Sequence, residues 1–355
     1  MNGTQTNLIH LKRLSRDELV VCVLFLLNKN LKMHIKITVL VSFLFSLYSC
    51  TTDLYKVDIV LSEGFEPQIA VTSVLNPDSA INLSCMLTVV AYSNKQTNAP
   101  VINKAILYDI TNSNVYELSK KSKNQSVLLS LNDLKPMQGG IYKVVLDTSN
   151  PTASIVITDT VPLLKPTITD VKISSIQNTV DFFGTVNFIP VVSERTVYYE
   201  LVIYCQRQGL LIPNPAEQYW QTTLKTSDRI VTQEDYYPSL LLLEAENPQS
   251  LLFRMDKNNI INTINFEYDA GSHGYWGHIS SIDNNLRIEL RVVSYNYFRY
   301  KTSLYKQKYA AEGDLLYGMP APVKVYSNVS GGVGVLGTYC KADTTVFVEG
   351  KTYRN

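Results

Sequence analysis

The chain has 355 residues, with 32 Lys and Arg against 31 Asp and Glu, so its formal net charge is +1. The basic residues are scattered, which excludes the concentrated positive surface that nucleic-acid binding requires. Tyr is abundant, with 23 residues, and Val, Ile and Thr recur in short runs. This composition is typical of a protein built from β-sheets.

The first 32 residues contain an apolar run over 19–27 (LVVCVLFLL), which Asn28-Lys29-Asn30 separates from a second apolar run. A run of this length cannot span a bilayer, which needs about 20 residues. Met33 begins a new pattern of a basic stretch followed by apolar residues. We therefore interpret Met33 as the start of translation. Residues 1–32 would then result from a start codon assigned too far upstream.

Residues 33–49 have the pattern of a secretory signal peptide. Lys36 precedes the apolar run 37–48, and the small residue Ser49 precedes Cys50. Leu47-Tyr48-Ser49-Cys50 resembles a bacterial lipobox, in which the thiol is diacylated and the Cys becomes the new N-terminus. The alternative, a transmembrane anchor, is disfavoured because the run is too short for a hydrocarbon core of about 30 Å. We expect a lipidated tether over 50–60.

Residues 61–162 read as a domain of short strands separated by turns. Gly140-Ile141-Tyr142 is a turn that leads into an alternating strand, as in the late strands of immunoglobulin-like domains. We predict an immunoglobulin-like or transthyretin-like β-sandwich, with a solvated loop over 119–125. The expected strands are 66–75, 81–92, 105–110, 115–118, 127–131, 141–147 and 153–158.

Val161-Pro162 and Lys165-Pro166 indicate an extended linker, because proline disfavours a helix or a central strand. A second β-rich domain is expected over 163–345, followed by a tail over 346–355. Its predicted strands are 167–176, 181–189, 196–206, 260–268 and 286–294, and its two predicted helices are 238–246 and 295–311. The second helix carries a stripe near helical spacing that we interpret as a packing face: Tyr297, Tyr300, Leu304, Tyr305, Lys308 and Tyr309.

Three cysteines follow Cys50. Cys85 and Cys205 lie in apolar strand-like runs, which favours buried free thiols. Cys340 completes an odd number, and the sequence does not decide whether any disulfide forms. No Cys/His spacing indicates a zinc site, and we expect no metal or other cofactor.

The candidate sites for chemistry are few. His273 and His278, with Asp269 or Asp283, could share a metal, but a Gly-rich loop between strands is the favoured interpretation. Tyr275 and Trp276 in that loop are suited to binding, since their rings offer a large contact area at low entropic cost. The carboxylates that a hydrolase would need are present, but their spacing selects no pair: Glu194, Glu200, Glu234, Asp235, Glu244 and Glu246.

The most specific stretch of the sequence is 320–337, in which Asn328 can cap a turn with its side chain. Gly331, Gly332 and Gly334 permit a positive φ or a close approach of two backbones, and Val333, Val335 and Leu336 would form a last strand. No Lys-Ser/Thr and no helix follow, so a phosphate-binding loop is disfavoured. Asn328, Gly331 and Gly332 are therefore candidates for binding.

This C-terminal stretch resembles the closing signature of a Bacteroidetes lipoprotein family known as domain of unknown function 4249. Further similarity covers essentially all of the chain after Cys50: Asn103-Lys104-Ala105, Gly140-Ile141-Tyr142, Phe253–Asn258 and Val293–Tyr300. Leu336 stands where an aromatic residue is common, and Cys340 is unexpected. The resemblance implies an outer-membrane lipoprotein of two mainly β domains, often encoded beside TonB-dependent receptors. It implies no catalytic residues.

The leading hypothesis is therefore a non-catalytic protein held in the outer membrane by acylated Cys50 (a palmitate-type modification). We expect it to bind or present a ligand as an accessory of a TonB-dependent receptor. Asp53 and Asp58 favour the cell surface over the periplasmic face. Two alternatives remain. One is a secreted hydrolase of glycans or peptides, which needs a cleft with two carboxylates. The other is an adhesin or fimbrial-type subunit, which needs an unpaired strand edge.

Overall fold

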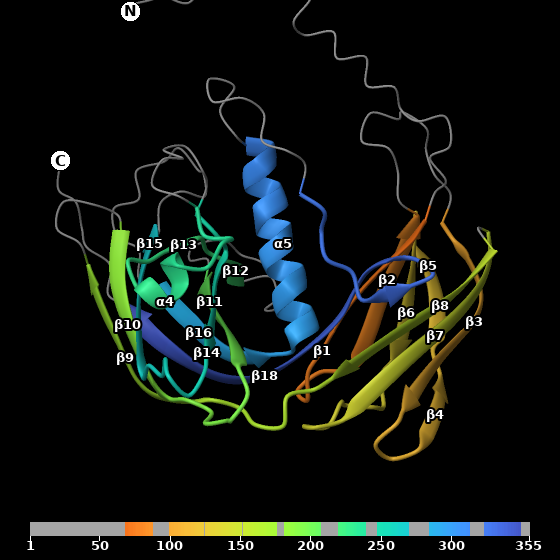
Figure 1. The fold of residues 1–355 in the computed structure, drawn as a ribbon, viewed down its shortest axis with the longest axis horizontal. Helices are drawn as coiled ribbons and strands as arrows, with labels where there is room; N and C mark the ends of the chain where they lie inside the picture. The colour runs from red at the N-terminus through yellow and green to blue at the C-terminus, as the bar shows by residue number, and fades with distance from the viewer. Residues whose placement is uncertain are drawn as a thin grey trace, which may run out of the picture. The chain divides into compact units, whose positions relative to one another are not determined.

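The computed structural model describes residues 68–87, 99–123, 125–150, 152–175, 181–206, 219–238, 247–269, 284–312 and 323–348. All of them belong to one unit, 66–355. The signal peptide, Cys50, the helix expected over 238–246 (of which only residue 238 is described) and the loop with His273 and His278 lie outside the described residues. Within those that are described, the fold is mainly β, as predicted, with strands far outnumbering helices (Figure 1).

The first set of strands forms two layers around an apolar core. In one layer β1, β2, β6 and β5 are neighbours in that order, and in the other the order is β17-β8-β7-β3-β4. Their inward residues alternate along each strand, for example Leu83 and Cys85 in β2 against Val144 and Leu146 in β7. The strands are β1 (Ile69–Leu75), β2 (Ile81–Leu87), β3 (Val101–Asp109), β4 (Asn114–Glu117), β5 (Ser119–Lys123), β6 (Ser126–Leu131), β7 (Ile141–Asn150), β8 (Thr152–Thr160) and β17 (Val329–Ser330).

One element of this sandwich contradicts the sequence prediction. Residues 119–125 were predicted to be a solvated loop, but Ser119–Lys123 is the edge strand β5, paired with β6. The lysines that suggested a loop are of the kind that protects an edge strand from further pairing. Lys120 also folds back, and its ammonium donates to the Asn103 carbonyl oxygen at 2.6 Å.

The second set of strands forms another pair of layers. One sheet has the order β13-β15-β10-β9, and it faces β12, β11, β16 and part of β18 across a core that includes Phe182, Leu201 and Ile288. The strands are β9 (Thr167–Ser175), β10 (Asp181–Ile189), β11 (Val197–Gln206), β12 (Tyr219–Gln221), β13 (Leu224–Lys225), β14 (Ser250–Met255), β15 (Thr263–Asp269), β16 (Asn284–Val293) and β18 (Val333–Val348). β14, which was not predicted, pairs with β11, and the short helix α4 spans Arg229–Thr232.

The last strand, β18, joins the two sets. Its first part, Val333–Thr338, pairs in parallel with β1, and its second part, Tyr339–Val348, pairs antiparallel with β16. A nine-stranded sheet therefore runs from β12 to β5 without interruption, with β14 as a branch on β11 (Figure 1). The glycine-rich stretch, which sequence analysis placed in the second domain, contributes Leu336 and Cys340 to the core of the first.

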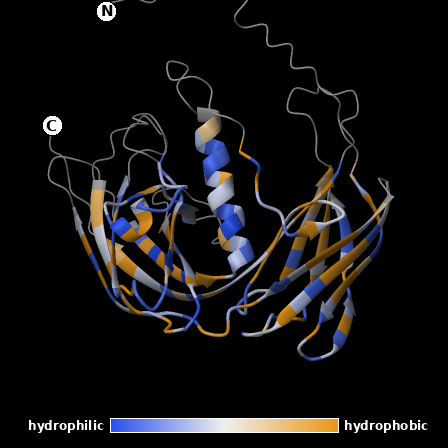
Figure 2. Ribbon diagram, viewed as in Figure 1, coloured by the Kyte–Doolittle hydropathy of each residue, from blue (hydrophilic) through white to orange (hydrophobic). Residues whose placement is uncertain are grey.

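Helix α5 (Tyr295–Glu312) matches the prediction of 295–311 within one residue. It starts where the Ser294 hydroxyl accepts a hydrogen bond from the Tyr297 amide at 3.2 Å, as an N-cap residue does. The packing face is confirmed for Tyr297, Tyr305 and Tyr309, but Leu304 is 39% exposed and Phe298 is buried instead. Figure 2 shows α5 as largely hydrophilic, so the buried face depends on tyrosines whose hydroxyl groups need polar partners.

The three described cysteines, Cys85, Cys205 and Cys340, are buried and free, which confirms the prediction for the first two. Burial raises the pKa of Cys85 and Cys205 to about 12 and that of Cys340 to about 11. A thiol with such a pKa is a poor nucleophile at neutral pH.

Candidate functional site

The face of the nine-stranded sheet that lies under α5 carries charged residues. β11 alternates, so that Leu201 and Ile203 point into the core between the two sheets while Glu200 points to the opposite face. β16 follows the same rule with Glu289 and Arg291. Because α5 covers this face, side chains that an uncovered sheet would expose to water are buried here.

Arg291 is at the centre of this buried network. Its Nη1 donates to Glu200 Oε2 at 2.9 Å and its Nε donates to Glu289 Oε2 at 3.0 Å. Nη2 donates to the Tyr204 hydroxyl at 2.9 Å, and the guanidinium lies 4.5 Å from the centroid of the Tyr339 ring. One arginine therefore binds two carboxylates through separate edges of its planar fork, which a lysine cannot do.

Glu200, which is fully buried, uses both of its oxygens. Oε1 accepts from the Ser250 hydroxyl at 2.8 Å and lies 3.7 Å from the Lys301 ammonium, while Oε2 also accepts from the Tyr297 hydroxyl at 2.8 Å. Lys301 and Tyr297 belong to α5, Ser250 to β14 and Arg291 to β16. The glutamate thus connects the helix to three strands of the sheet.

The cations decide the protonation state of both acids. Burial by itself would raise the pKa of Glu200, but Lys301, Arg291 and two hydrogen bonds lower it below its usual value. Burial opposes ionisation of Glu289 too, and Arg291 and Lys341 lower its pKa in the same way. A carboxylate that stays ionised and bonded on all sides is a poor proton donor, so this pair holds the structure together and does not have the properties of an acid/base pair.

Sequence analysis named Glu200 among the available carboxylates but not Glu289 or Arg291. The sequence pattern that could have identified Glu289 and Arg291 is the alternation of Leu286, Ile288 and Leu290 with charged neighbours along β16. That pattern predicts a half-exposed strand, and only the position of α5 reveals that the charged face is covered.

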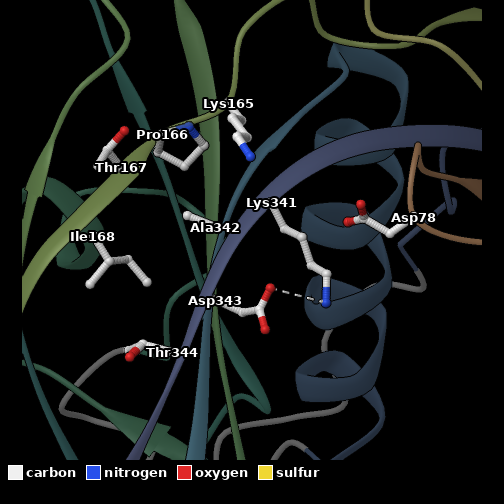
Figure 3. Close-up of a pocket in the computed structure, with 9 residues that line it drawn as sticks. All are labelled: Asp78, Lys165, Pro166, Thr167, Ile168, Lys341, Ala342, Asp343 and Thr344. Atoms are coloured by element: carbon white, nitrogen blue, oxygen red, sulfur yellow. Dashed lines mark ion pairs between the residues drawn. The ribbon is translucent and has the colours of Figure 1, made fainter.

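A groove opens on the sheet beside the second part of β18 (Figure 3). Its volume is about 560 Å³. Figure 3 shows Lys341 and Asp343 on β18, with Asp78 and Lys165 from other segments around them. The Lys341 ammonium lies 3.5 Å from Asp343 and 3.1 Å from Glu289, so it connects the groove to the buried network.

A second hollow of about 630 Å³ continues along the same two strands, with the apolar side chains of Val346 and Phe347 on β18 and Ile173 on β9. Both hollows are lined by consecutive residues, 341–344 and 346–348 on β18 and 171–174 on β9. Consecutive residues point to opposite faces of a strand. The lining is therefore formed by the edges of the strands, and we call the two hollows together the β9–β18 groove.

Of the predicted binding residues, Asn328 has a structural partner. Its side-chain amide donates to the Leu336 carbonyl at 2.9 Å, and its oxygen accepts from the Leu336 amide at 3.0 Å. This is the bonding pattern that a neighbouring strand would supply. Because Leu336 is fully buried, Asn328 satisfies two backbone groups that would otherwise be unpaired.

The predicted glycines let the chain pass from one layer to the other. Gly331 has φ +79°, and a Cβ there would lie 2.3 Å from the Ser154 carbonyl oxygen of β8. Gly334 has φ +116°, and a Cβ would lie 2.0 Å from the Val71 carbonyl oxygen of β1. A Cβ at Gly332 would lie 2.5 Å from the Ile69 carbonyl oxygen of β1. The signature thus brings β17 to β8 and β18 to β1, and it leaves no room for a Cβ at these three positions.

The other candidate binding residues, Tyr275, Trp276, His273 and His278, lie outside the described residues, as does Cys50. In the ranges that the structure describes, no group of three or more His, Cys, Asp or Glu side chains is arranged to hold a metal ion. No helix within the same ranges is long and apolar enough to cross a membrane.

Comparison with known protein families identifies one model, described as Domain of unknown function (DUF4249), which matches residues 33–345. The match covers most of the chain and starts at Met33. No curated protein matches the chain. The family resemblance drawn from the C-terminal signature is thus confirmed, while the lipid anchor and the receptor remain predictions.

Proposed function

The chain belongs to the family described as Domain of unknown function (DUF4249), and from this we propose that it is a non-catalytic lipoprotein of the outer membrane. It is anchored through acylated Cys50, and it binds or presents a ligand as an accessory of a TonB-dependent receptor. The observation that carries the anchor is the Leu47-Tyr48-Ser49-Cys50 sequence at the end of an apolar run too short to span the bilayer.

The carboxylates of the network under α5 support a binding role over hydrolysis, and Glu234, whose pKa burial raises, forms an ion pair with Arg254 at 2.9 Å. A glycan or peptide hydrolase needs two convergent carboxylates in a cleft, one of them with a raised pKa. Glu200 and Glu289 do converge, but on Arg291, and both have a lowered pKa. Neither lines the β9–β18 groove.

The anchor also explains how a small contact surface can be sufficient for a stable complex with the receptor. A protein held in the membrane by two acyl chains meets a receptor in the same plane at high effective concentration. An affinity that would be weak in solution then gives a stable complex. Surface display remains our expectation from Asp53 and Asp58.

One observation favours a second candidate, an adhesin or fimbrial-type subunit. Such a subunit needs an unpaired strand edge, and the β9–β18 groove is bordered by two strand edges. In that case a second copy of the chain supplies the missing strand, and purified protein should form polymers.

The proposal is tested in cells that carry the full chain with a C-terminal affinity tag. Labelling with an alkyne analogue of palmitate should mark the wild type and not Cys50→Ala, and affinity purification from detergent-treated outer membranes should recover a TonB-dependent receptor. Unlabelled wild-type protein would contradict the anchor, and purification without a receptor would contradict the accessory role. Polymers in the purified sample would favour the second candidate.

The loop at Tyr275 and Trp276 is tested in the same strain. Replacing both with Ala should reduce receptor recovery or ligand uptake and leave the amount of folded protein unchanged. The matched control is the double replacement of Tyr295 and Leu304, which are exposed on α5. Equal effects from the two double variants would remove the loop from the proposal.

A further inference from the structure

The backbone of β18 directs alternate residues to opposite sides. The Ser294 amide donates to the Thr338 carbonyl at 2.9 Å, and the register Val293↔Tyr339 continues without a bulge to Asn284↔Val348. Hydrogen-bonded pairs alternate along an antiparallel ladder. Even-numbered residues from 338 to 348 therefore bond toward β16, and odd-numbered residues from 339 to 347 present their N–H and C=O groups to the other side.

Within the part of the chain that the structure describes, that other side is paired only along the first part of the strand. β1 pairs with β18 as far as Leu75↔Thr338 and then turns away at Asn76, whose side-chain amide donates to the Tyr339 hydroxyl at 3.1 Å. Among the described strands none pairs with the side to which Lys341, Asp343, Thr345 and Phe347 direct their backbone groups. β9, across the groove, pairs with β10 and with no other described strand.

The two edges of the groove differ in how they are protected. β9 carries the exposed ion pair between Asp170 and Lys172, and charged residues on an edge discourage pairing with another chain. The second part of β18 ends in Thr344-Thr345-Val346-Phe347-Val348, with the Phe347 side chain 60% exposed. A long β-rich edge with no proline, no bulge and no charge at its end is an open template for another strand.

The side chains around this edge define what it can accept. At one end Lys165 and Asp78 are both exposed and form no ion pair within the described residues, while Lys341 is already neutralised by Glu289 and Asp343. At the other end Phe347, Val346 and Ile173 are apolar. An incoming extended segment is therefore complementary if it carries a carboxylate near Lys165, a basic side chain near Asp78 and a large apolar side chain over Phe347.

The core behind the edge is already complete. Phe182 and Val348, which lie behind the apolar end, are 7% and 8% exposed. An incoming strand would thus extend the sheet at its edge, and no gap in the core requires a donor strand from another copy.

We propose that the free edge of β18, residues 339–348, docks an extended segment of a partner polypeptide as an added β-strand, and that this segment carries charged residues, an acid among them, at one end and a large apolar residue at the other. The inference rests on the proposed function, because it states how the membrane partner is held. Main-chain hydrogen bonds to the odd-numbered residues give affinity, and Lys165 and Phe347 set the register and the choice of segment.

Thr345 is the position at which a substitution can test the docking proposal with the smallest effect on the fold. Its N–H faces the free edge, its side chain is exposed, and proline is tolerated on an edge strand when the missing N–H faces outward. Thr345→Pro removes one docking hydrogen bond and places a ring where the incoming strand must lie. Thr345→Ala is the matched control, because it keeps the N–H. Lys165→Glu is a second variant that leaves the strand itself intact.

The experiment places a photo-reactive benzophenone amino acid at position 347 of the full chain in its native membrane. Irradiation followed by mass spectrometry should identify one extended segment of the receptor with an acidic and an apolar residue. We expect the cross-link to fall at least tenfold with Thr345→Pro and several-fold with Lys165→Glu, and to persist with Thr345→Ala, while thermal melting confirms that all variants fold.

The outcomes separate this inference from the proposed function. A receptor that co-purifies equally with wild type and Thr345→Pro overturns the docking edge and leaves the accessory role intact. A proline-sensitive cross-link to an extended segment of another protein, with no receptor recovered, supports the edge and overturns the accessory role. A cross-link to a second copy of the chain, a cross-link insensitive to proline, or no cross-link overturns the inference.

Discussion

The two parts of β18 differ in how the rest of the described chain pairs with their edges. Over Val333–Thr338 both edges are covered, one by β1 and the other, at Leu336, by the Asn328 side chain. Over Tyr339–Val348 β16 pairs with one edge, and the other edge has no partner among the described strands. The strand β18 therefore has partners on both edges where it joins the two sets of strands. Where it borders the groove, one edge has no partner among the described strands.

The difference shows what the family signature does. Asn328 and Gly334 act on the first part of β18, and Gly331 and Gly332 act just before it, at positions where a neighbouring backbone leaves no room for a Cβ. The second part is connected to the network of Glu200, Glu289 and Arg291 through the ion pair between Lys341 and Glu289. Structural residues thus hold β18 firmly on one edge, and the opposite edge is left with main-chain groups that another chain can use.

The largest effect is expected from Arg291→Leu, which removes the support under the second part of β18. It leaves Glu200 and Glu289 buried without their shared cation, and breaking a buried pair in this way costs about 3–5 kcal/mol. Urea unfolding followed by circular dichroism measures the loss. Arg195→Leu, in an exposed loop, is the control, and similar losses from both would refute the central role of Arg291.

Gly334→Ala tests the first part of β18, which pairs with β1. A Cβ would lie 2.0 Å from the Val71 carbonyl oxygen, at a φ of +116° that side chains rarely adopt. Strain of this kind costs about 1–3 kcal/mol before the clash is relieved. Thermal unfolding should show the loss, with Ser330→Ala as a neutral control, and a wild-type melting temperature would mean that β1 and β18 tolerate a wider spacing.

Asn328→Ala tests the side-chain cover of Leu336. It leaves a buried N–H and a buried C=O without partners, at a cost of about 1–3 kcal/mol. Asn328→Asp should lose at least as much at neutral pH, because its carboxylate still accepts from the Leu336 amide but sets a second acceptor oxygen against the Leu336 carbonyl. A wild-type urea midpoint in Asn328→Asp would show that the bond to the carbonyl is not needed, and would contradict the two-bond clamp.

Acid should weaken the network without any mutation. The folded-state pKa values of Glu200 and Glu289 are lowered, so their contribution is complete above the unfolded pKa of about 4.3 and is lost as the pH falls through the folded values. Asp159, whose pKa burial raises, works in the opposite direction and offsets part of the loss. Unfolding free energy measured from pH 6 to pH 3 should decline in the wild type, and an equal decline in Arg291→Leu would contradict the assignment.

The smallest effect on stability is expected at the open edge. Thr345→Pro should change the free energy of unfolding by less than about 1 kcal/mol, because its N–H has no partner within the described residues. Thr344→Pro, one residue away, removes a bond to β16 and leaves a β16 carbonyl without its partner, which should cost about 1–3 kcal/mol. Equal costs at the two positions would show that both N–H groups are bonded.

Much of the fold was predictable from local pattern. Alternation located β10 without error, and the tyrosine spacing located α5 to within one residue. The lysine-rich strand β5 was missed because charge at an edge resembles a loop. Burial of Glu289 and Arg291 was missed because it depends on a helix that follows them in the chain and covers their face of the sheet.

The candidate site was predicted only in part. Asn328, Gly331 and Gly332 were identified from residue type, but their partners, Leu336, Ser154 and Ile69, depend on a register that sequence does not reveal. The open edge of β18 has no sequence signature at all. It arises because β1 turns away at Asn76, long before β18 ends.

Amide hydrogen exchange along β18 of the purified full chain, resolved by NMR, tests the central claim most directly. The amides of Lys341, Asp343, Thr345 and Phe347 should exchange rapidly, while those of Ala342, Thr344 and Val346, which bond to β16, exchange slowly. Over Val333–Thr338, Val335 and Gly337, which face β1, and Leu336, which is held by Asn328, should all be protected. Uniform slow exchange from residue 339 to 348 would show that the edge is already occupied, and would contradict the account.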